Sequence, residues 1–365
     1  MNPSERSTLR RSAVSELHSD AAAGGSERAE EAQRPQGAEH SQGAERAEPT
    51  EQPARARLSL VPPRPSSPQR YSPLALWHLL SLDAPTVAAL WTWTVAHTVG
   101  IVLPWTASAA MALAVWMLYA SDRLLDARPL PGGEAPRDLE ERHRFHQRHR
   151  SVFLAAIVAV AAVLAGLLHT LDPRALHLYA ALATMLAAWL LLVHAPSPAA
   201  ASAQRLPKEL AVGIFFPAAV FIPTVARAPE LRLPLLAPAA IFAALCTLNC
   251  LYLYAWEHPA SLRTAHWTTR WAVRRLVPLT LTVAALSALL VVAALPAALP
   301  LASRLAPHGA GSFLLPALCT LVSTLLLLAL HKLRDRLSAL HLRALADLVL
   351  LSPLLVVPLA SLASR

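Results

Sequence analysis

The chain has 365 residues, of which 55% are hydrophobic and only 15% are charged, and its mean hydropathy is positive. The net charge of +9 arises after residue 70, because the first 70 residues hold ten arginines and ten acidic residues. Long apolar runs between short charged loops exclude a soluble globular enzyme and a secreted disulfide scaffold. The arginines lie beside these runs and form no aromatic-interleaved patch, so no nucleic-acid partner is expected.

Residues 1–70 contain no apolar stretch and are rich in Ala, Glu, Arg, Ser, Gln and Pro. Such a segment cannot bury enough surface to offset the entropy lost on ordering, so it is predicted to be a disordered tail. It also lacks the apolar core of a cleaved signal peptide. The sequence therefore predicts two parts, a tail over residues 1–70 and a membrane domain over residues 71–365.

Nine apolar segments follow the tail, each about 17–25 residues long, the length that a helix needs to cross ~30 Å of hydrocarbon. They are residues 84–103, 105–121, 151–169, 175–194, 209–227, 235–256, 276–299, 312–330 and 342–362. Backbone polar groups in lipid must be satisfied within the segment, so the spans are predicted to be α-helices. Leu103-Pro104-Trp105 predicts a tight interfacial turn between the first two spans. The expected fold class is an all-α, polytopic membrane protein with nine transmembrane helices.

The distribution of positive residues predicts the orientation. With the amino terminus in the cytoplasm, 17 of the 22 Lys and Arg residues after residue 70 lie on the cytoplasmic side and five lie outside. The positive-inside rule favours this arrangement. We expect a multi-pass protein of the cell (inner) membrane, surrounded by membrane lipids, with a cytoplasmic amino terminus.

Two carboxylates stand one helical turn apart at the cytoplasmic end of the second predicted span. Asp122 and Asp126 are spaced i and i+4, so they share one helix face. Such a pair can hold Mg²⁺ between the protein and the phosphate oxygens of a substrate, since Mg²⁺ retains several waters and takes few protein ligands. The alternative is that both carboxylates pair with nearby arginines.

Two loops on the same side carry cations. The segment 140–150 holds four arginines, of which Arg144 is a candidate for binding a diphosphate, or alternatively for contacting anionic lipid headgroups. Lys208 could meet a phosphate while Glu209 orients it, although a snorkelling lysine would look the same. Gly213, one turn further on, predicts a close helix–helix contact.

The sixth predicted span ends in polar and aromatic residues. Asn249, Tyr252, Tyr254 and Glu257 lie where a substrate cation would need stabilisation, or alternatively form an aromatic belt with an interhelical hydrogen bond. The three cysteines all lie within predicted spans without zinc-ligand spacing, so they are interpreted as packing residues and no disulfide is expected.

The nine spans, the Asp-x-x-x-Asp pair after the second span and the polar end of the sixth resemble the UbiA superfamily of intramembrane prenyltransferases. The resemblance covers about residues 75–365 and implies a UbiA-like bundle that binds Mg²⁺ and a prenyl diphosphate. It implies that Asp122, Asp126 and Glu257 are catalytic and hold the metal. A polyprenyl group would pass to a lipophilic acceptor, for example an aromatic one. Substrate-binding residues would be Arg144, Lys208, Glu209, Asn249, Tyr252 and Tyr254.

Two other functions are compatible with the sequence. Leu118 and Tyr119 stand where that family has Asn and Asp, and no second carboxylate follows Glu257 at the expected spacing. A catalytically lapsed lipid-binding or assembly protein with the same fold is therefore the first alternative. A transporter is the second, and the clustering of acidic residues at one membrane face argues against it.

Overall fold

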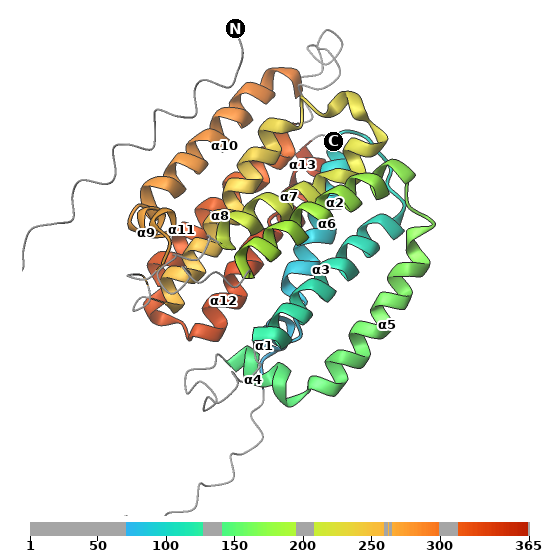
Figure 1. Ribbon diagram of the computed structural model, residues 1–365. Coiled ribbons are helices and arrows are strands. Elements are labelled where there is room, and N and C mark those ends of the chain that lie inside the picture. The colour runs from blue at the N-terminus through green and yellow to red at the C-terminus, as the bar shows by residue number, and fades with distance from the viewer. Residues whose placement is uncertain are drawn as a thin grey trace, which may run out of the picture. The chain divides into compact units, whose positions relative to one another are not determined.

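The computed structural model describes residues 71–126, 141–194, 208–258, 262, 265–298 and 313–363. The predicted tail, residues 1–70, lies outside the described residues. All regular secondary structure in the described part of the chain is helical, which confirms the all-α class (Figure 1). The bounds of the helices follow.

The α-helices are α1 (Pro73–Leu79), α2 (Asp83–Thr98), α3 (Trp105–Asp126), α4 (Glu141–Arg148), α5 (Arg150–Leu168), α6 (Pro173–His194), α7 (Lys208–Arg227), α8 (Leu236–Glu257), α9 (Trp267–Arg274), α10 (Leu276–Ala298), α11 (Leu314–Leu333), α12 (Ala339–Leu348) and α13 (Pro353–Ala363). Three short 3₁₀-helices accompany them: η3 (Pro229–Leu231), η6 (Arg334–Arg336) and η7 (Val349–Leu351).

Six helical segments in the described residues are long and apolar enough to cross a membrane, and a seventh arises if the bent pair α1–α2 counts as one span. The six comprise α5, α7, α8, α10, α11 with η6, and most of the stretch from α12 to α13. The predicted segments 105–121 and 175–194 are helical as α3 and α6 but do not belong to this set. The described residues are therefore compatible with a multi-pass membrane protein, and six or seven of the nine predicted spans meet this test of length and composition.

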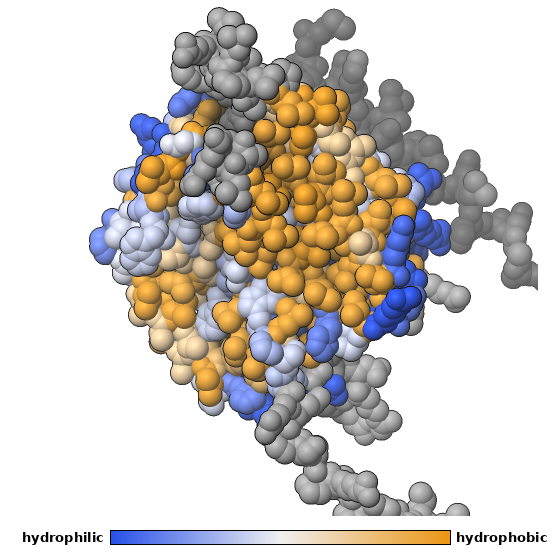
Figure 2. Space-filling view, turned by 180° about the vertical axis from the view of Figure 1, so that it is seen from behind, coloured by the Kyte–Doolittle hydropathy of each residue, from blue (hydrophilic) through white to orange (hydrophobic). Residues whose placement is uncertain are grey.

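The surface is as apolar as a membrane protein requires. Figure 2 shows one face covered by hydrophobic residues, with hydrophilic residues gathered toward its edges. Large apolar side chains on the outer helices are exposed, including Val158 of α5, Leu191 of α6 and Leu289 of α10. In water so large an exposed apolar surface would cause aggregation, whereas the acyl chains of a lipid bilayer can surround these side chains.

The core joins helices that are distant in the sequence. Trp91 of α2 is fully buried and stacks on Phe242 of α8, with ring centroids 3.9 Å apart. Its indole Nε1 donates a hydrogen bond of 2.8 Å to the carbonyl oxygen of Leu350 in η7. One side chain thus connects the amino-terminal, middle and carboxyl-terminal helices. Cys246, Cys250 and Cys319 are free thiols within α8 and α11.

Gly213 lies at the contact between α7 and α8, which confirms the predicted close approach. A Cβ atom added to Gly213 would stand 1.8 Å from Oγ1 of Thr247 and 3.2 Å from the carbonyl oxygen of Ala243. The two helices can approach this closely only because residue 213 has no side chain.

Substitution of Gly213 by alanine is expected to destabilise the protein by about 1–3 kcal/mol, because the methyl group forces α7 away from α8. The midpoint of thermal unfolding in detergent would measure this loss. Gly166→Ala in α5 is the matched control, since a Cβ there meets no atom within 4 Å. Equal melting temperatures for the two variants would contradict the expectation.

Candidate functional site: a buried His–Asp–Arg–Asp cluster

The site is built around the break between α1 and α2. Ser72 caps α1, its hydroxyl accepting a hydrogen bond of 3.2 Å from the backbone N–H of Ala75. The chain then turns at Ser81, whose φ of 59° lies in the left-handed region, and the two helices meet at 88°. This sharp bend brings the side chains of His78 and Asp83 together. His78 Nδ1 and Asp83 Oδ2 are 2.6 Å apart.

Arg123 of α3 forms hydrogen bonds with the turn between α1 and α2. Its Nη1 donates to the carbonyl oxygen of His78 at 2.7 Å and to Oγ of Ser81 at 2.8 Å, and its Nη2 donates to Oδ2 of Asp83 at 3.3 Å. The hydroxyl of Ser81 also lies 3.1 Å from Nε2 of His146 in α4. A guanidinium group suits this position because its planar fork can satisfy several acceptors at once.

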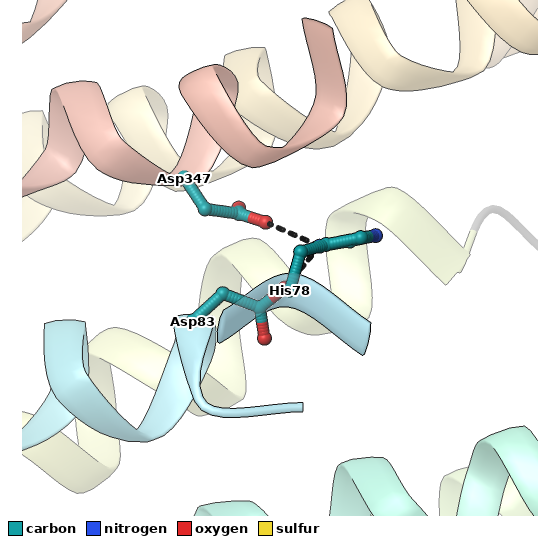
Figure 3. A group of neighbouring side chains, drawn as sticks. All are labelled: His78, Asp83 and Asp347. Atoms are coloured by element: carbon teal, nitrogen blue, oxygen red, sulfur yellow. Dashed lines mark hydrogen bonds and ion pairs between the residues drawn. The ribbon is translucent and has the colours of Figure 1, made fainter. Parts of the chain in front are cut away.

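Asp347 of α12 completes the cluster from the carboxyl-terminal part of the chain. Its Oδ2 lies 4.0 Å from Nδ1 of His78, and its Oδ1 accepts a hydrogen bond of 3.0 Å from Nδ2 of Asn249 in α8. One ligand atom each from His78, Asp83 and Asp347 lies within 4.8 Å of the others. Figure 3 shows Asp347 above and Asp83 below His78, with dashed lines joining both carboxylates to the imidazole.

Most of the cluster is buried, and the side chain of Asp347 is 17% exposed. His78 and Asp83 are each 1% exposed, Arg123 is 3% exposed and Asn249 is 5% exposed. Burial of charge is costly unless the charges are paired, so the ion pair between Arg123 and Asp83 is needed for both to remain here. Three buried polar atoms nevertheless lack a hydrogen-bond partner, namely His78 Nε2, Arg123 Nε and Asn249 Oδ1.

A second ion pair lies at the end of α8. Glu257, the last residue of that helix, accepts a hydrogen bond from Nη1 of Arg343 in α12. Glu209 at the start of α7 accepts a weaker hydrogen bond of 3.4 Å from the hydroxyl of Thr269 in α9. One contact thus connects α8 with α12, and the other connects α7 with α9.

The predicted site residues fall into separate environments. Asn249 belongs to the buried cluster, and Glu257 and Glu209 are held by the contacts just described. Asp122 is exposed near the end of α3, whereas its neighbour Arg123 is buried. Tyr252 is buried and its hydroxyl lies 2.7 Å from that of Thr280 in α10.

The remaining predicted residues are only partly described. Arg144 is exposed on α4, and Tyr254 stacks on the imidazole of His258, with ring centroids 5.4 Å apart. The side chains of Asp126 and Lys208 lie outside the described residues, although Asp126 ends α3 and Lys208 begins α7. The Asp122–Asp126–Glu257 metal set therefore stays a prediction.

Sequence reasoning missed His78, Asp83, Arg123 and Asp347 as site residues. A usable signal existed, because ionisable residues in apolar runs are costly and mark functional positions. Asp347 is the one acidic residue in the predicted span 342–362, and His78 and Asp83 interrupt the apolar run from residue 73 to 102.

Neither the protein-family models, nor the curated proteins, nor the solved structures contain a match to this chain.

Proposed function

We propose that the chain is a divergent intramembrane prenyltransferase with a UbiA-like bundle of nine spans. It would transfer a polyprenyl group from its diphosphate to a lipophilic acceptor such as an aromatic ring. In this proposal α3 and α6, each 22 residues long, also cross the membrane. The protein would lie in the cell (inner) membrane with its amino terminus in the cytoplasm.

One observation carries the proposal: charged side chains from opposite parts of the chain meet within an otherwise apolar helical bundle. Arg123, adjacent to Asp122 at the end of α3, contacts Asp83. Asp347, next to Asp83, contacts Asn249, which lies about two turns before Glu257 on α8. The helices α3 and α8 are thus linked through one polar cluster. A prenyl diphosphate, with an anionic head and an apolar tail, needs this combination of charged and apolar surroundings.

The residue types fit a hydrated Mg²⁺ ion, since carboxylate oxygens are its preferred protein ligands. Asp122, Asp126 and Glu257 would hold it, and Asp122 is exposed and so accessible to a hydrated ion. The bound ion would neutralise charge on the departing diphosphate. Arg144 and Lys208, the latter oriented by Glu209, would bind the phosphate oxygens.

The chain's own aromatic residues would serve the prenyl group. Tyr254 is partly buried near the end of α8, and Tyr252 lies half a turn before it, with its ring 5.5 Å from that of Trp256. Electron-rich ring faces stabilise a nearby cation. These rings would steady the allylic cation that develops as the diphosphate departs, and Asn249 would contribute a polar contact.

Purified protein in detergent is expected to bind farnesyl diphosphate only when Mg²⁺ is present. Asp122→Asn should weaken this binding about tenfold or more, because it removes one anionic ligand. Glu230→Gln is the matched control. Glu230 is exposed and follows the carboxyl-terminal end of α7, whereas Glu209 lies at the start of that helix. Isothermal titration with and without EDTA would measure both. Binding that is independent of metal, or unchanged by Asp122→Asn, would refute the proposal.

A specific observation favours the second candidate, a lipid-binding or assembly protein without turnover. Glu257 already has a guanidinium partner in Arg343, which reduces its capacity to hold a metal. Such a protein would bind a prenyl lipid but release no diphosphate. Assay of diphosphate release in the presence of a mixture of aromatic acceptors separates the two candidates.

A further inference from the structure

We infer that His78, Asp83 and Asp347 form a binding site for a divalent transition-metal ion, with the amide oxygen of Asn249 as a further ligand. This site shares no residue with the set Asp122, Asp126 and Glu257. Among the described residues, these three are the one group of His, Cys, Asp or Glu side chains close enough to hold an ion together.

The distances suit an ion after small shifts. Neighbouring ligands around a zinc or manganese ion, bound at about 2.1 Å, stand about 3 Å or more from one another. His78 Nδ1 lies 2.6 Å from Oδ2 of Asp83 and 4.0 Å from Oδ2 of Asp347. These values bracket the required spacing. All three ligand atoms lie within 4.8 Å of one another, so an ion entering the cluster would open the His78–Asp83 contact by a few tenths of an ångström and draw Asp347 in by a small side-chain shift.

The charges also favour a cation. Asp83 and Asp347 bring two carboxylates to this cluster, and Arg123 brings one guanidinium group. With a neutral imidazole, one negative charge is in excess. Two carboxylates held together away from water repel each other strongly unless a cation lies between them.

Unpartnered polar atoms give an independent indication. Asn249 donates its amide N–H to Oδ1 of Asp347, and its own Oδ1 is buried without a hydrogen-bond partner. Buried polar atoms are nearly always satisfied, so one without a partner calls for an explanation such as an ion. An ion between the carboxylates would supply the missing partner to Asn249.

The ligand types select the ion. One imidazole with two carboxylates and an amide oxygen is a mixed nitrogen and oxygen set, which suits Mn²⁺ or Zn²⁺ better than Mg²⁺ or a thiol-seeking ion. Arg123 would remain in place and hold Asp83, as supporting residues around metal sites commonly do. The ion would tie the α1–α2 break to α8 and α12.

The test uses full-length protein purified in detergent with a tag that contains no histidine. The protein is treated with EDTA, dialysed and titrated with Mn²⁺, whose free form gives a six-line electron paramagnetic resonance signal. We expect tight binding of about one ion per chain, with electron spin-echo modulation from an imidazole nitrogen. Zn²⁺ should displace the ion. No prenyl diphosphate is added, so the result is independent of the proposed function.

Two variants and two controls locate the site. His78→Gln should abolish the imidazole modulation, and Asp347→Asn should weaken Mn²⁺ binding about tenfold or more while the modulation persists at saturating metal. His97→Gln and Asp335→Asn are controls at exposed positions. Asp83 is left unchanged because its loss would leave Arg123 without its carboxylate partner.

Some results would overturn the inference even if a variant fails to fold. Wild-type protein that binds no Mn²⁺ or Zn²⁺, or that binds Mn²⁺ without nitrogen modulation, excludes this site. Such a result would mean that a shared proton or a protonated imidazole balances the carboxylates. Binding that survives unchanged in His78→Gln and Asp347→Asn would place the ion elsewhere in the chain.

Discussion

Replacement of Arg123 by methionine is expected to destabilise the protein by about 3–5 kcal/mol, the usual cost of leaving one partner of a buried ion pair unpaired. Methionine preserves much of the side-chain length, so the loss reports the guanidinium group. Asp83, 1% exposed, would keep its contact with His78 but lose its compensating charge. Ser81 and the carbonyl oxygen of His78 would also lose their donor. Thermal unfolding in detergent would measure the change.

The double variant Arg123→Met, Asp83→Asn separates charge from packing. Removal of the unpaired carboxylate should recover part of the lost stability, because an amide costs less to bury than an isolated carboxylate. Arg174→Met, at an exposed position at the start of α6, is the matched control and should change stability by less than about 0.5 kcal/mol. A loss below about 1 kcal/mol for Arg123→Met would show that water reaches the cluster.

Trp91→Ala is expected to cost about 3–5 kcal/mol, the typical cost of truncating a buried aromatic side chain. The indole is fully buried, stacks on Phe242 and donates to the carbonyl oxygen of Leu350, so its loss opens a cavity where three parts of the chain meet. The same unfolding assay applies. The helix content by circular dichroism should persist, because each helix satisfies its own backbone hydrogen bonds in lipid or detergent.

Two variants provide the comparison for Trp91. Trp91→Phe keeps most of the volume and loses the hydrogen bond, so it should cost less than the alanine variant. Trp93→Ala is the control, since Trp93 is 42% exposed on the same helix and stacks on His97. Equal losses for Trp91→Ala and Trp93→Ala would mean that lipid or detergent contacts, and not the packed core, set the stability.

Much of the fold could be predicted from the sequence because membrane helices are specified locally. The stretch 235–256 was predicted as a span and is α8, Leu236–Glu257, since about 20 apolar residues must satisfy their backbone internally. Gly213 was predicted at a close contact and lies against Thr247. The break before Trp105 was predicted from Pro104, and α3 begins there.

The ends of the helices were harder to predict. The second span was predicted to end at residue 121, whereas α3 continues to Asp126. Its last turn continues in regular helix and carries Arg123 into the bundle. Hydropathy indicates where a helix could leave the lipid, but it does not indicate where the helix ends. A helix can continue past its apolar segment when its charged residues form ion pairs or hydrogen bonds with other helices.

The composition of the chain thus determined that it is an all-α membrane protein. The backbone hydrogen-bonding groups of an apolar segment of membrane length can be satisfied only in a helix, whatever its neighbours are. Only the tertiary structure decided which charged residues meet. Asp122 and Arg123 are adjacent in sequence and equally conspicuous, yet Arg123 is buried against Asp83 and Asp122 is exposed. That choice depends on the rotation of α3 and on the bend at Ser81, and His78 and Asp347, 269 residues apart, meet through packing alone. Local sequence patterns carry no record of such contacts, because they arise from the mutual fit of helix faces that are far apart in the chain.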